Sequence, residues 1–270
     1  VDPLTGLQAI IAIHNSRLGP ALGGCRYLPY ADSQSAIEDV LRLAKGMSYK
    51  AALAGLQQGG GKAVIIRPAH VDNRGALFEA FGRFIETLNG RYITAMDSGT
   101  SSVDMDCIAQ HTQHVTSTTA EGDPSPHTAL GVFTGIRATA LARLGSDNLE
   151  GLRVAIQGLG NVGYALAEQL HAAGAELLVS DLDHGRVQLA VEQLGARPVA
   201  SEALLATPCD ILAPCGLGGV RAARNDVDGR PAGALDEVLG GVAVTDGGPP
   251  LGYAVGAAAG VDGDVVEHPR

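Results

Sequence analysis

RVAIQGLGNVG, residues 153–163, joins an apolar strand-like run to the start of a helical pattern through a glycine-rich turn. Gly158, Gly160 and Gly163 form a complete GxGxxG, which is a dinucleotide-binding fingerprint when it lies between a strand and a helix. In that setting Gly158 forms the turn, Gly160 lets the backbone approach a pyrophosphate, and Gly163 lets the helix pack against the strand. The alternative is a glycine turn in an α/β sheet that binds no cofactor.

A carboxylate lies where this fingerprint needs one. Asp181 ends the next strand-like run, AELLVSD at 175–181. A carboxylate there binds the adenine ribose and repels a 2′-phosphate, so the sequence predicts NAD in preference to NADP, a preference that the nearby Arg186 would weaken. The start of the helix, at Asn161 and Val162, supplies free amide donors for the phosphates.

Strand and helix patterns alternate on both sides of the fingerprint. After the polar, proline-containing stretch EGDPSPHT at 121–128, helical spacing resumes at about Ala129, and apolar runs alternate with helical ones up to Pro214. Such alternation is typical of a parallel, doubly wound sheet. We therefore predict a Rossmann-like NAD-binding domain over residues 126–220.

Residues 1–125 predict a separate α/β domain for substrate binding and catalysis. The expected elements are a helix over 33–53, a strand over 63–66 after a glycine turn, a helix over 74–88 and a strand over 91–95. Asp97 follows the last of these strands. Because ligands bind at the carboxyl ends of strands in open α/β sheets, Asp97 is a candidate for the site.

Lysine is rare in this chain, which has only Lys45, Lys50 and Lys62 against sixteen arginines. A desolvated lysine can lose its proton and act as a base, whereas arginine cannot. Lys62 follows three glycines, but a phosphate-binding loop would need Ser or Thr after the lysine, and Ala63 is present instead. A plain linker or turn is the other alternative. We predict that Lys50 and Lys62 take part in chemistry, with a surface role open for Lys45.

The composition excludes several classes of function. A formal charge of −10 argues against nucleic acid as a partner, and we find no secretory signal and no long apolar run for a membrane. The four cysteines, at positions 25, 107, 209 and 215, lack CxxC spacing and histidine neighbours. We expect a cytoplasmic protein with reduced thiols and no metal site.

Several stretches of the first 220 residues resemble the glutamate/leucine/phenylalanine/valine group of amino acid dehydrogenases, and they are most similar to its leucine and valine branch. They are LGPALGGCR, LRLAKGMSYKAALAGLQQGGGKAVI, YITAMDSGT, QGLGNVG and DILAPC. The resemblance implies a homo-oligomeric, NAD-dependent enzyme that deaminates a branched aliphatic L-amino acid to a 2-oxo acid and ammonia. A phenylalanine or tryptophan specificity, and an inactive NAD-binding relative, are the alternatives.

The resemblance also implies roles for single residues. Lys50 binds the substrate carboxylate, Lys62 activates the water that attacks the imine, and Asp97 exchanges a proton with the amine. A low pKa would suit Lys62 as a base, and burial together with the charge of Lys50 favours one. Gly23 and Gly24 let the backbone close on the substrate. The remaining implied contacts are Met47 in the substrate pocket and Thr128 and Cys215 near the cofactor. Taken alone, Met47 suggests core packing and Thr128 suggests helix capping.

Residues 221–270 depart from the family pattern. Gly, Ala, Val, Asp and Glu, whose codons all begin with G, make up 35 of these 50 residues. A shifted reading frame in GC-rich DNA would produce this bias. We predict an atypical tail that is either non-native or a divergent, flexible C-terminus.

Overall fold

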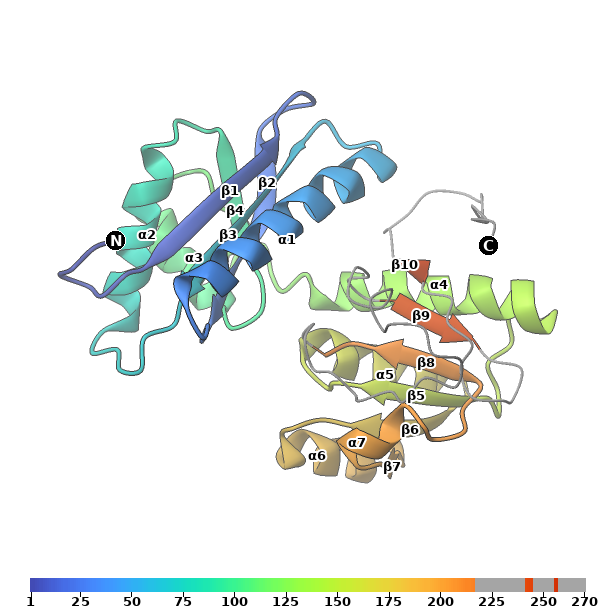
Figure 1. The fold of residues 1–270 in the computed structure, drawn as a ribbon. Helices are drawn as coiled ribbons and strands as arrows, with labels where there is room; N and C mark the ends of the chain where they lie inside the picture. Colours follow the sequence, from blue (N-terminus) through green and yellow to red (C-terminus); the bar gives the residue numbers. More distant parts are fainter. Residues whose placement is uncertain (217–240, 245–254, 257–270) are drawn as a thin grey trace. The chain divides into compact units, whose positions relative to one another are not determined.

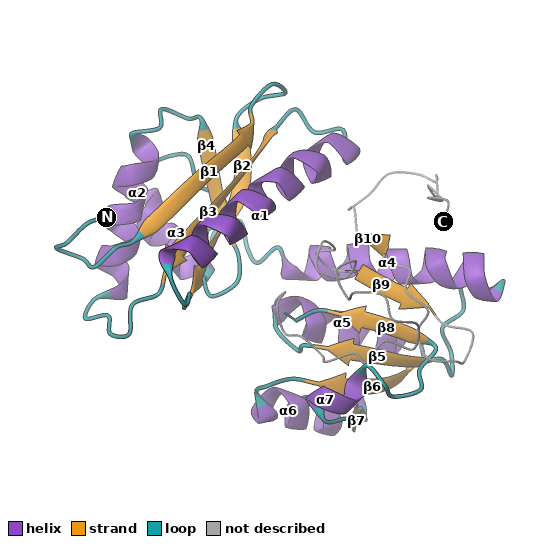
Figure 2. Cartoon of the chain, viewed as in Figure 1, coloured by secondary structure: helices purple, strands orange, loops and turns teal. Residues whose placement is uncertain are grey.

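The computed structural model describes residues 1–216, 241–244 and 255–256. Its chain divides into two compact units, the first holding Val1–Pro124 and the second beginning at Ser125. Each unit combines helices with a largely parallel sheet, which confirms the predicted α/β fold class (Figure 2). Apart from two short strands, the predicted atypical tail lies outside the described residues.

The first unit is a four-stranded sheet with the order β1-β3-β2-β4. Its strands are β1 (Ala9–Asn15), β2 (Ala21–Leu28), β3 (Gly59–Ile66) and β4 (Tyr92–Met96), and its helices are α1 (Ser33–Leu53), α2 (Arg74–Glu86) and α3 (Ser102–Ala109). Helix α1 covers one face of this sheet, and α2 and α3 lie on the other (Figure 1). Alternate residues of β3 point to these opposite faces: Val64 packs with α1, whereas Ala63 and Ile65 pack with α2 and α3. Only β1 runs antiparallel to its neighbour.

The three glycines before Lys62 lie inside strand β3, so the prediction of a glycine turn followed by a strand at Ala63 was wrong. The strand begins at Gly59 and pairs with β1 and β2 through this segment. A Cβ on Gly60 would lie 2.2 Å from Ser48 of α1, and one on Gly61 would lie 2.8 Å from the Tyr92 ring of β4. The glycines are therefore required because other elements approach the strand too closely for a side chain.

The second unit has a six-stranded sheet with the order β10-β9-β8-β5-β6-β7. Its strands are β5 (Arg153–Gln157), β6 (Glu176–Ser180), β7 (Arg197–Pro198), β8 (Ile211–Pro214), β9 (Gly241–Val244) and β10 (Val255–Gly256), and its helices are α4 (Ser125–Leu144), α5 (Asn161–Ala172), α6 (His184–Leu194) and α7 (Ser201–Leu204). Strands β5 to β8 run parallel, and β9 and β10 are antiparallel additions. This is the expected Rossmann-like arrangement.

Helix α4 begins at Ser125, four residues before the predicted start at Ala129. Pro126 is the second residue of the helix, and proline is tolerated in a first turn because the amide it lacks would have no partner there. None of the described helices has the length and apolar composition needed to cross a membrane.

Candidate functional site

Lys62 and Asp97, which are 35 positions apart in the chain, form an ion pair in the first unit. Lys62 Nζ donates a hydrogen bond to Asp97 Oδ2. Lys62 lies within β3 and Asp97 follows the carboxyl end of β4, with β2 between these two strands. The exposed fractions of the two side chains are only 9% and 19%. The sheet therefore unites two of the three predicted catalytic residues in a largely buried pair.

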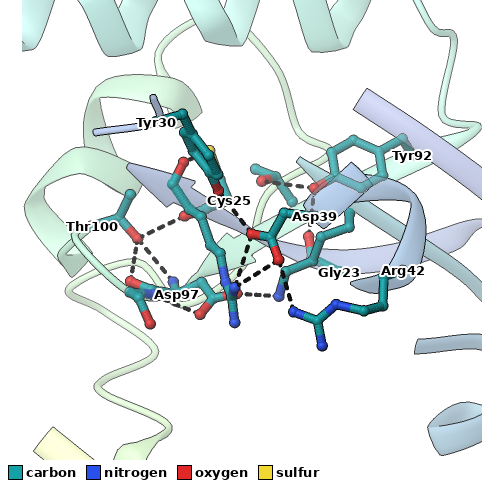
Figure 3. Close-up of polar contacts among 12 residues, drawn as sticks. Gly23, Cys25, Tyr30, Asp39, Arg42, Tyr92, Asp97 and Thr100 are labelled. Carbon is teal, nitrogen blue, oxygen red and sulfur yellow. Dashed lines mark hydrogen bonds and ion pairs between the residues drawn. The ribbon is translucent and has the colours of Figure 1, made fainter. Parts of the chain in front are cut away.

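Backbone and hydroxyl groups fix the position of Asp97. Ser98 N donates to Asp97 Oδ1 at 2.6 Å, and Asp97 N donates to Thr100 Oγ1 at 2.8 Å. Thr100 Oγ1 also lies 3.1 Å from the Cys25 carbonyl oxygen, which ties the loop to β2 (Figure 3). The carboxylate thus has a defined orientation before any ligand binds.

Two cations keep Asp97 ionised. Burial by itself would raise the pKa of this carboxyl, but the charges of Lys62 and Arg26 and the hydrogen bonds from Lys62 and Ser98 outweigh it and lower the pKa to about 2. Arg26 Nε lies 3.7 Å from Asp97 Oδ2. At neutral pH the side chain is therefore an anion.

Lys50, the third predicted catalytic residue, lies in the last turns of α1 and is exposed. Protein atoms around its ammonium group desolvate it, and this desolvation and the charge of Lys62 lower its pKa, against the opposing effect of Asp97. The charges of both members of the buried pair thus act on Lys50. Met47 is half-buried one turn earlier on the same helix.

Gly23 and Gly24 lie on β2 between the strands that carry the pair. A Cβ on Gly23 would lie 1.7 Å from the Gly61 carbonyl oxygen, and one on Gly24 would lie 2.8 Å from Asp97 Cβ. Both glycines are thus needed for the packing of the strands and of Asp97. A contact with substrate, which the resemblance implies for them, stays a prediction.

Sequence reasoning missed a polar network that adjoins the pair. Arg26 Nη1 lies 3.0 Å from Asp39 Oδ2, and Asp39 also accepts hydrogen bonds from Tyr30 (2.8 Å) and Arg42 (2.9 Å) (Figure 3). Arg26 thereby links this network to Asp97. The available signal was the arginine in ALGGCRYL, a charged residue inside an otherwise buried strand.

Cys25, Cys107 and Cys215 are free thiols, and the described residues contain no group of three or more His, Cys, Asp or Glu side chains placed to hold a metal. Burial raises the pKa of Cys25 well above its ordinary value, and the charge of Asp97 adds to this effect. Burial also raises the pKa of Cys215 to about 12. Both thiols are therefore protonated at neutral pH and suited to packing.

In the second unit the three fingerprint glycines have different surroundings. Gly158 has a φ of +92°, and a Cβ there would lie 2.6 Å from Gly216 N. A Cβ on Gly163 would lie 2.0 Å from the Gly158 carbonyl oxygen, whereas one on Gly160 would come no closer than 3.6 Å to Arg186 Nη1. Gly158 and Gly163 are thus required by the fold, whereas a Cβ on Gly160 would only reach van der Waals distance from the Arg186 side chain, and a contact of Gly160 with a pyrophosphate stays a prediction.

Asp181 supports the same turn from the end of β6. Its Oδ2 accepts a hydrogen bond from Leu159 N at 2.5 Å, and its Oδ1 accepts one from Asp183 N at 2.7 Å. Arg186 Nη1 lies 3.4 Å from the Leu159 carbonyl oxygen. A contact between Asp181 and a ribose stays a prediction.

Of the other predicted cofactor contacts, Asn161, Val162 and Cys215 adjoin the glycine turn, since a Cβ on Gly163 would lie 3.2 Å from Cys215 Cβ. Asn161 and Val162 begin α5, with Gly160 as the residue before its first turn. Thr128 is exposed in the first turn of α4. Cys215 directly follows β8, and its backbone N–H donates to the Gln157 carbonyl oxygen at 2.7 Å.

Comparison with known protein families covers both units. Residues 2–114 match "Glu/Leu/Phe/Val dehydrogenase, dimerisation domain", and residues 123–187 match "Glutamate/Leucine/Phenylalanine/Valine dehydrogenase". The chain belongs to the Glu/Leu/Phe/Val dehydrogenase family. This membership confirms the resemblance inferred from the lysine, aspartate and glycine motifs.

Several members of this family are similar over most of the chain. A leucine dehydrogenase of Geobacillus stearothermophilus is 53% identical over 223 residues, which are 81% of this chain and 61% of the relative. A phenylalanine dehydrogenase of Lysinibacillus sphaericus is 46% identical over 81% of this chain and 60% of its own. The crystal structure of L-tryptophan dehydrogenase from Nostoc punctiforme matches with a TM-score of 0.59 and 43% identity, over 82% of this chain and 63% of that one.

The chain thus spans about three-fifths of the length of the curated family members it matches. These members carry the names of three different amino acids. Family membership therefore supports an amino acid dehydrogenase and leaves the side chain of its substrate open.

Proposed function

We propose that this chain belongs to an enzyme that deaminates an L-amino acid with a branched aliphatic side chain, in an NAD-dependent reaction that yields a 2-oxo acid, ammonia and NADH. The observation that carries the proposal is the buried pair of Lys62 and Asp97 with Lys50 beside it. The 53% identity to a leucine dehydrogenase supports the choice of substrate. The Phe- and Trp-named relatives make an aromatic side chain the second candidate.

The charges of the first unit suit the substrate. Lys50, exposed on α1, would bind the carboxylate of an amino acid. Asp97 is an anion in this structure, so it is suited to bind the substrate ammonium first. Lys62 separates from Asp97 to act as a base, and a proton that Asp97 takes from the substrate ammonium is passed on again, because the nearby cations keep the carboxyl pKa low.

Lys62 then has the role of base. Hydride transfer from Cα leaves a C=N bond whose carbon must be attacked by water, and a neutral Lys62 would take the proton from that water. Water oxygen enters the product carbonyl, ammonia leaves, and the two electrons of the Cα–H bond depart with the hydride. Lys62 would first release its own proton to solvent, so that the proton it takes from water restores its charge, and Asp97 would return the ammonium proton to the departing nitrogen, which restores the starting ion pair.

The second unit suits NAD, which accepts the hydride when bound. The open space over Gly160 and the amides at Asn161 and Val162 would hold the pyrophosphate. Asp181 would bind the adenine ribose and favour NAD over NADP. The remaining cofactor contacts that we propose are Thr128, Cys215 and the backbone at Gly158 and Gly163.

We also propose a homo-oligomer, which the description "dimerisation domain" of the matching family region supports. The partner of the site is a small amino acid. A cytoplasmic location agrees with the free thiols of Cys25, Cys107 and Cys215, since cytosolic cysteines stay reduced.

The test is NADH formation at alkaline pH, followed by absorbance, with L-leucine, L-valine, L-phenylalanine, L-tryptophan and L-glutamate, first with NAD and then with NADP. We expect turnover with leucine and valine, with NAD preferred. Lys62→Ala should lower kcat at least about 100-fold while NADH binding, measured by fluorescence, is retained. Wild-type rates in Lys62→Ala would contradict the proposed base. NADH binding without any turnover would identify an inactive relative.

A further inference from the structure

The guanidinium group of Arg26 carries an unused donor at the candidate active site. Its side chain is 9% exposed, and no acceptor among the described residues makes a hydrogen bond with Nε. Buried donors without a partner are uncommon because their desolvation is costly. The charged group facing this Nε is Asp97, whose Oδ2 lies 3.7 Å away, just beyond hydrogen-bond distance.

The other end of Arg26 is anchored. Its Nη1 lies 3.0 Å from Asp39 Oδ2, and Asp39 is itself held by the Tyr30 hydroxyl and by Arg42. A guanidinium that is fixed in this way does not move when the Asp97 side chain moves. It stays in place as a second partner toward which the carboxylate can turn.

Asp97 faces both cations with one atom. Oδ2 accepts the hydrogen bond from Lys62 and also lies nearest to Arg26 Nε, while Oδ1 is held by Ser98 N. A small rotation of the carboxyl group would therefore move Oδ2 from Lys62 to Arg26 and leave the Ser98 contact in place.

We propose that Arg26 is a positioning residue that holds the Asp97 carboxylate, in place and ionised, when Lys62 separates from it. The inference rests on the proposed function, in which Lys62 must leave Asp97 to act as a base. Removing one partner of a buried pair leaves an uncompensated charge, which is strongly unfavourable. Arg26 would compensate the charge of Asp97 after Lys62 has left, because a guanidinium does not deprotonate in proteins.

Other titratable groups around Asp97 do not replace Arg26. Those whose charges act on Asp97, or are acted on by it, are Lys62 of β3, Cys25 of β2, Tyr92 of β4, Lys50 of α1 and Tyr30 after β2. Burial raises the pKa of Cys25, of Tyr92 and of Tyr30, so these groups are neutral near pH 7. Lys50 is committed to the substrate carboxylate in the proposed reaction.

The decisive experiment measures Asp97 in the absence of the lysine. In Lys62→Met protein labelled with 13C at aspartate Cγ, the NMR signal of Asp97 is assigned by its loss in Lys62→Met/Asp97→Asn. We expect the pKa of Asp97 to stay below its ordinary value of 3.8, because Arg26 still compensates the charge. In Lys62→Met/Arg26→Gln it should rise above 3.8, since burial then acts without a facing cation. A pKa above 3.8 in Lys62→Met itself would overturn the inference.

Steady-state kinetics of Arg26→Gln test the inference independently, with Arg42→Gln as the matched control. Arg26→Gln should lower kcat at least about tenfold with little change in the KM for the amino acid, and should raise the pKa of Asp97 by about one pH unit. Arg42→Gln, which also removes a cation from Asp39 but leaves Arg26 in place beside Asp97, should change both quantities much less. Equal effects of the two substitutions would mean that Arg26 is merely structural. Should Arg26→Gln fail to fold, the Lys62→Met titration still decides.

The two proposals fail differently. A wild-type chain that binds NADH but deaminates no amino acid contradicts the proposed function. An active wild-type chain whose Asp97 titrates above 3.8 in Lys62→Met contradicts only the role of Arg26.

Discussion

Asp97 is the side chain on which the candidate active site depends. Its carboxylate is largely buried, and burial is favourable only because Lys62 and Arg26 compensate its charge. Neither cation is a sequence neighbour of the aspartate. The charge state of the site is therefore set by the sheet, which places β3 and β4 on the two sides of β2.

This compensation predicts a pH dependence of stability. The pKa of Asp97 falls from its ordinary value of 3.8 to about 2 in the folded protein. A lowered folded-state pKa contributes stability that is fully present above pH 3.8 and is lost as the pH falls through about 2. The full contribution is about 2 kcal/mol, and roughly half of it is lost by pH 3.

Urea unfolding between pH 6 and pH 3 measures this dependence. Asp97→Asn should be less stable than wild type at pH 6, with the difference shrinking by about 1 kcal/mol at pH 3. Asp72→Asn is a suitable control, because the Asp72 side chain is 93% exposed, and it should show no such convergence. A wild-type advantage that is constant with pH would contradict the assignment of a charged, compensated Asp97.

In strand β3, glycine is required by the close approach of neighbouring elements and not by a turn. Gly61→Ala would place a methyl group 2.8 Å from the Tyr92 ring and 3.1 Å from Ala21. We expect a loss of about 1–3 kcal/mol in unfolding free energy from this overpacking. Gly135→Ala in helix α4, where no atom lies within 4 Å of the new Cβ, should be neutral or stabilising. Equal stability of the two variants in urea would contradict the close packing of β3.

Two glycines in the turn between β5 and α5 are expected to differ, Gly163 being needed for folding and Gly160 for ligand binding. Gly163→Ala would place its methyl group 2.0 Å from the Gly158 carbonyl oxygen and should destabilise the second unit. Gly160→Ala meets only Arg186 at 3.6 Å and should fold as wild type, yet bind NADH at least about tenfold more weakly, because the methyl group fills the space proposed for the pyrophosphate. Circular dichroism and NADH fluorescence distinguish the two effects. Undiminished NADH binding in Gly160→Ala would show that the pyrophosphate does not bind at this turn.

The described residues form two principal hydrophobic cores, one in each unit. The cluster around Phe78 and Ile65 lies entirely in the first unit, and the cluster around Ile156 and Leu166 lies entirely in the second. We expect two calorimetric unfolding transitions, since each core is complete within its own unit. NADH at about 100 times its Kd should stabilise the second unit by about 2.7 kcal/mol.

The Gly160→Ala variant shows which of the two unfolding transitions belongs to the second unit. It should unfold in the same two steps, and the same NADH concentration should stabilise its second unit by no more than about 1.4 kcal/mol. A single transition that NADH shifts as a whole would show instead that the two units unfold as one.

Local patterns predicted much of this molecule. Helix α1 spans Ser33–Leu53 and strand β5 spans Arg153–Gln157, as helical and strand-like spacing indicated. The glycine fingerprint lies between a strand and a helix as expected, and the order of the lysine and aspartate motifs identified the family. These features could be read directly because periodicity, turn geometry and short motifs depend on residues a few positions apart.

The strand order, the reason for the glycines of β3 and the partners of Asp97 came only from the folded chain. Gly61 is excluded from carrying a side chain by Tyr92, and Asp97 is held by Lys62 and approached by Arg26, all more than 30 positions away. Periodicity does not specify which distant element fills the space beside a strand, because strand pairing is decided by the packing of the whole sheet. For the same reason the donor of Arg26, unremarkable in the sequence, becomes a part of the site once β2 lies between β3 and β4.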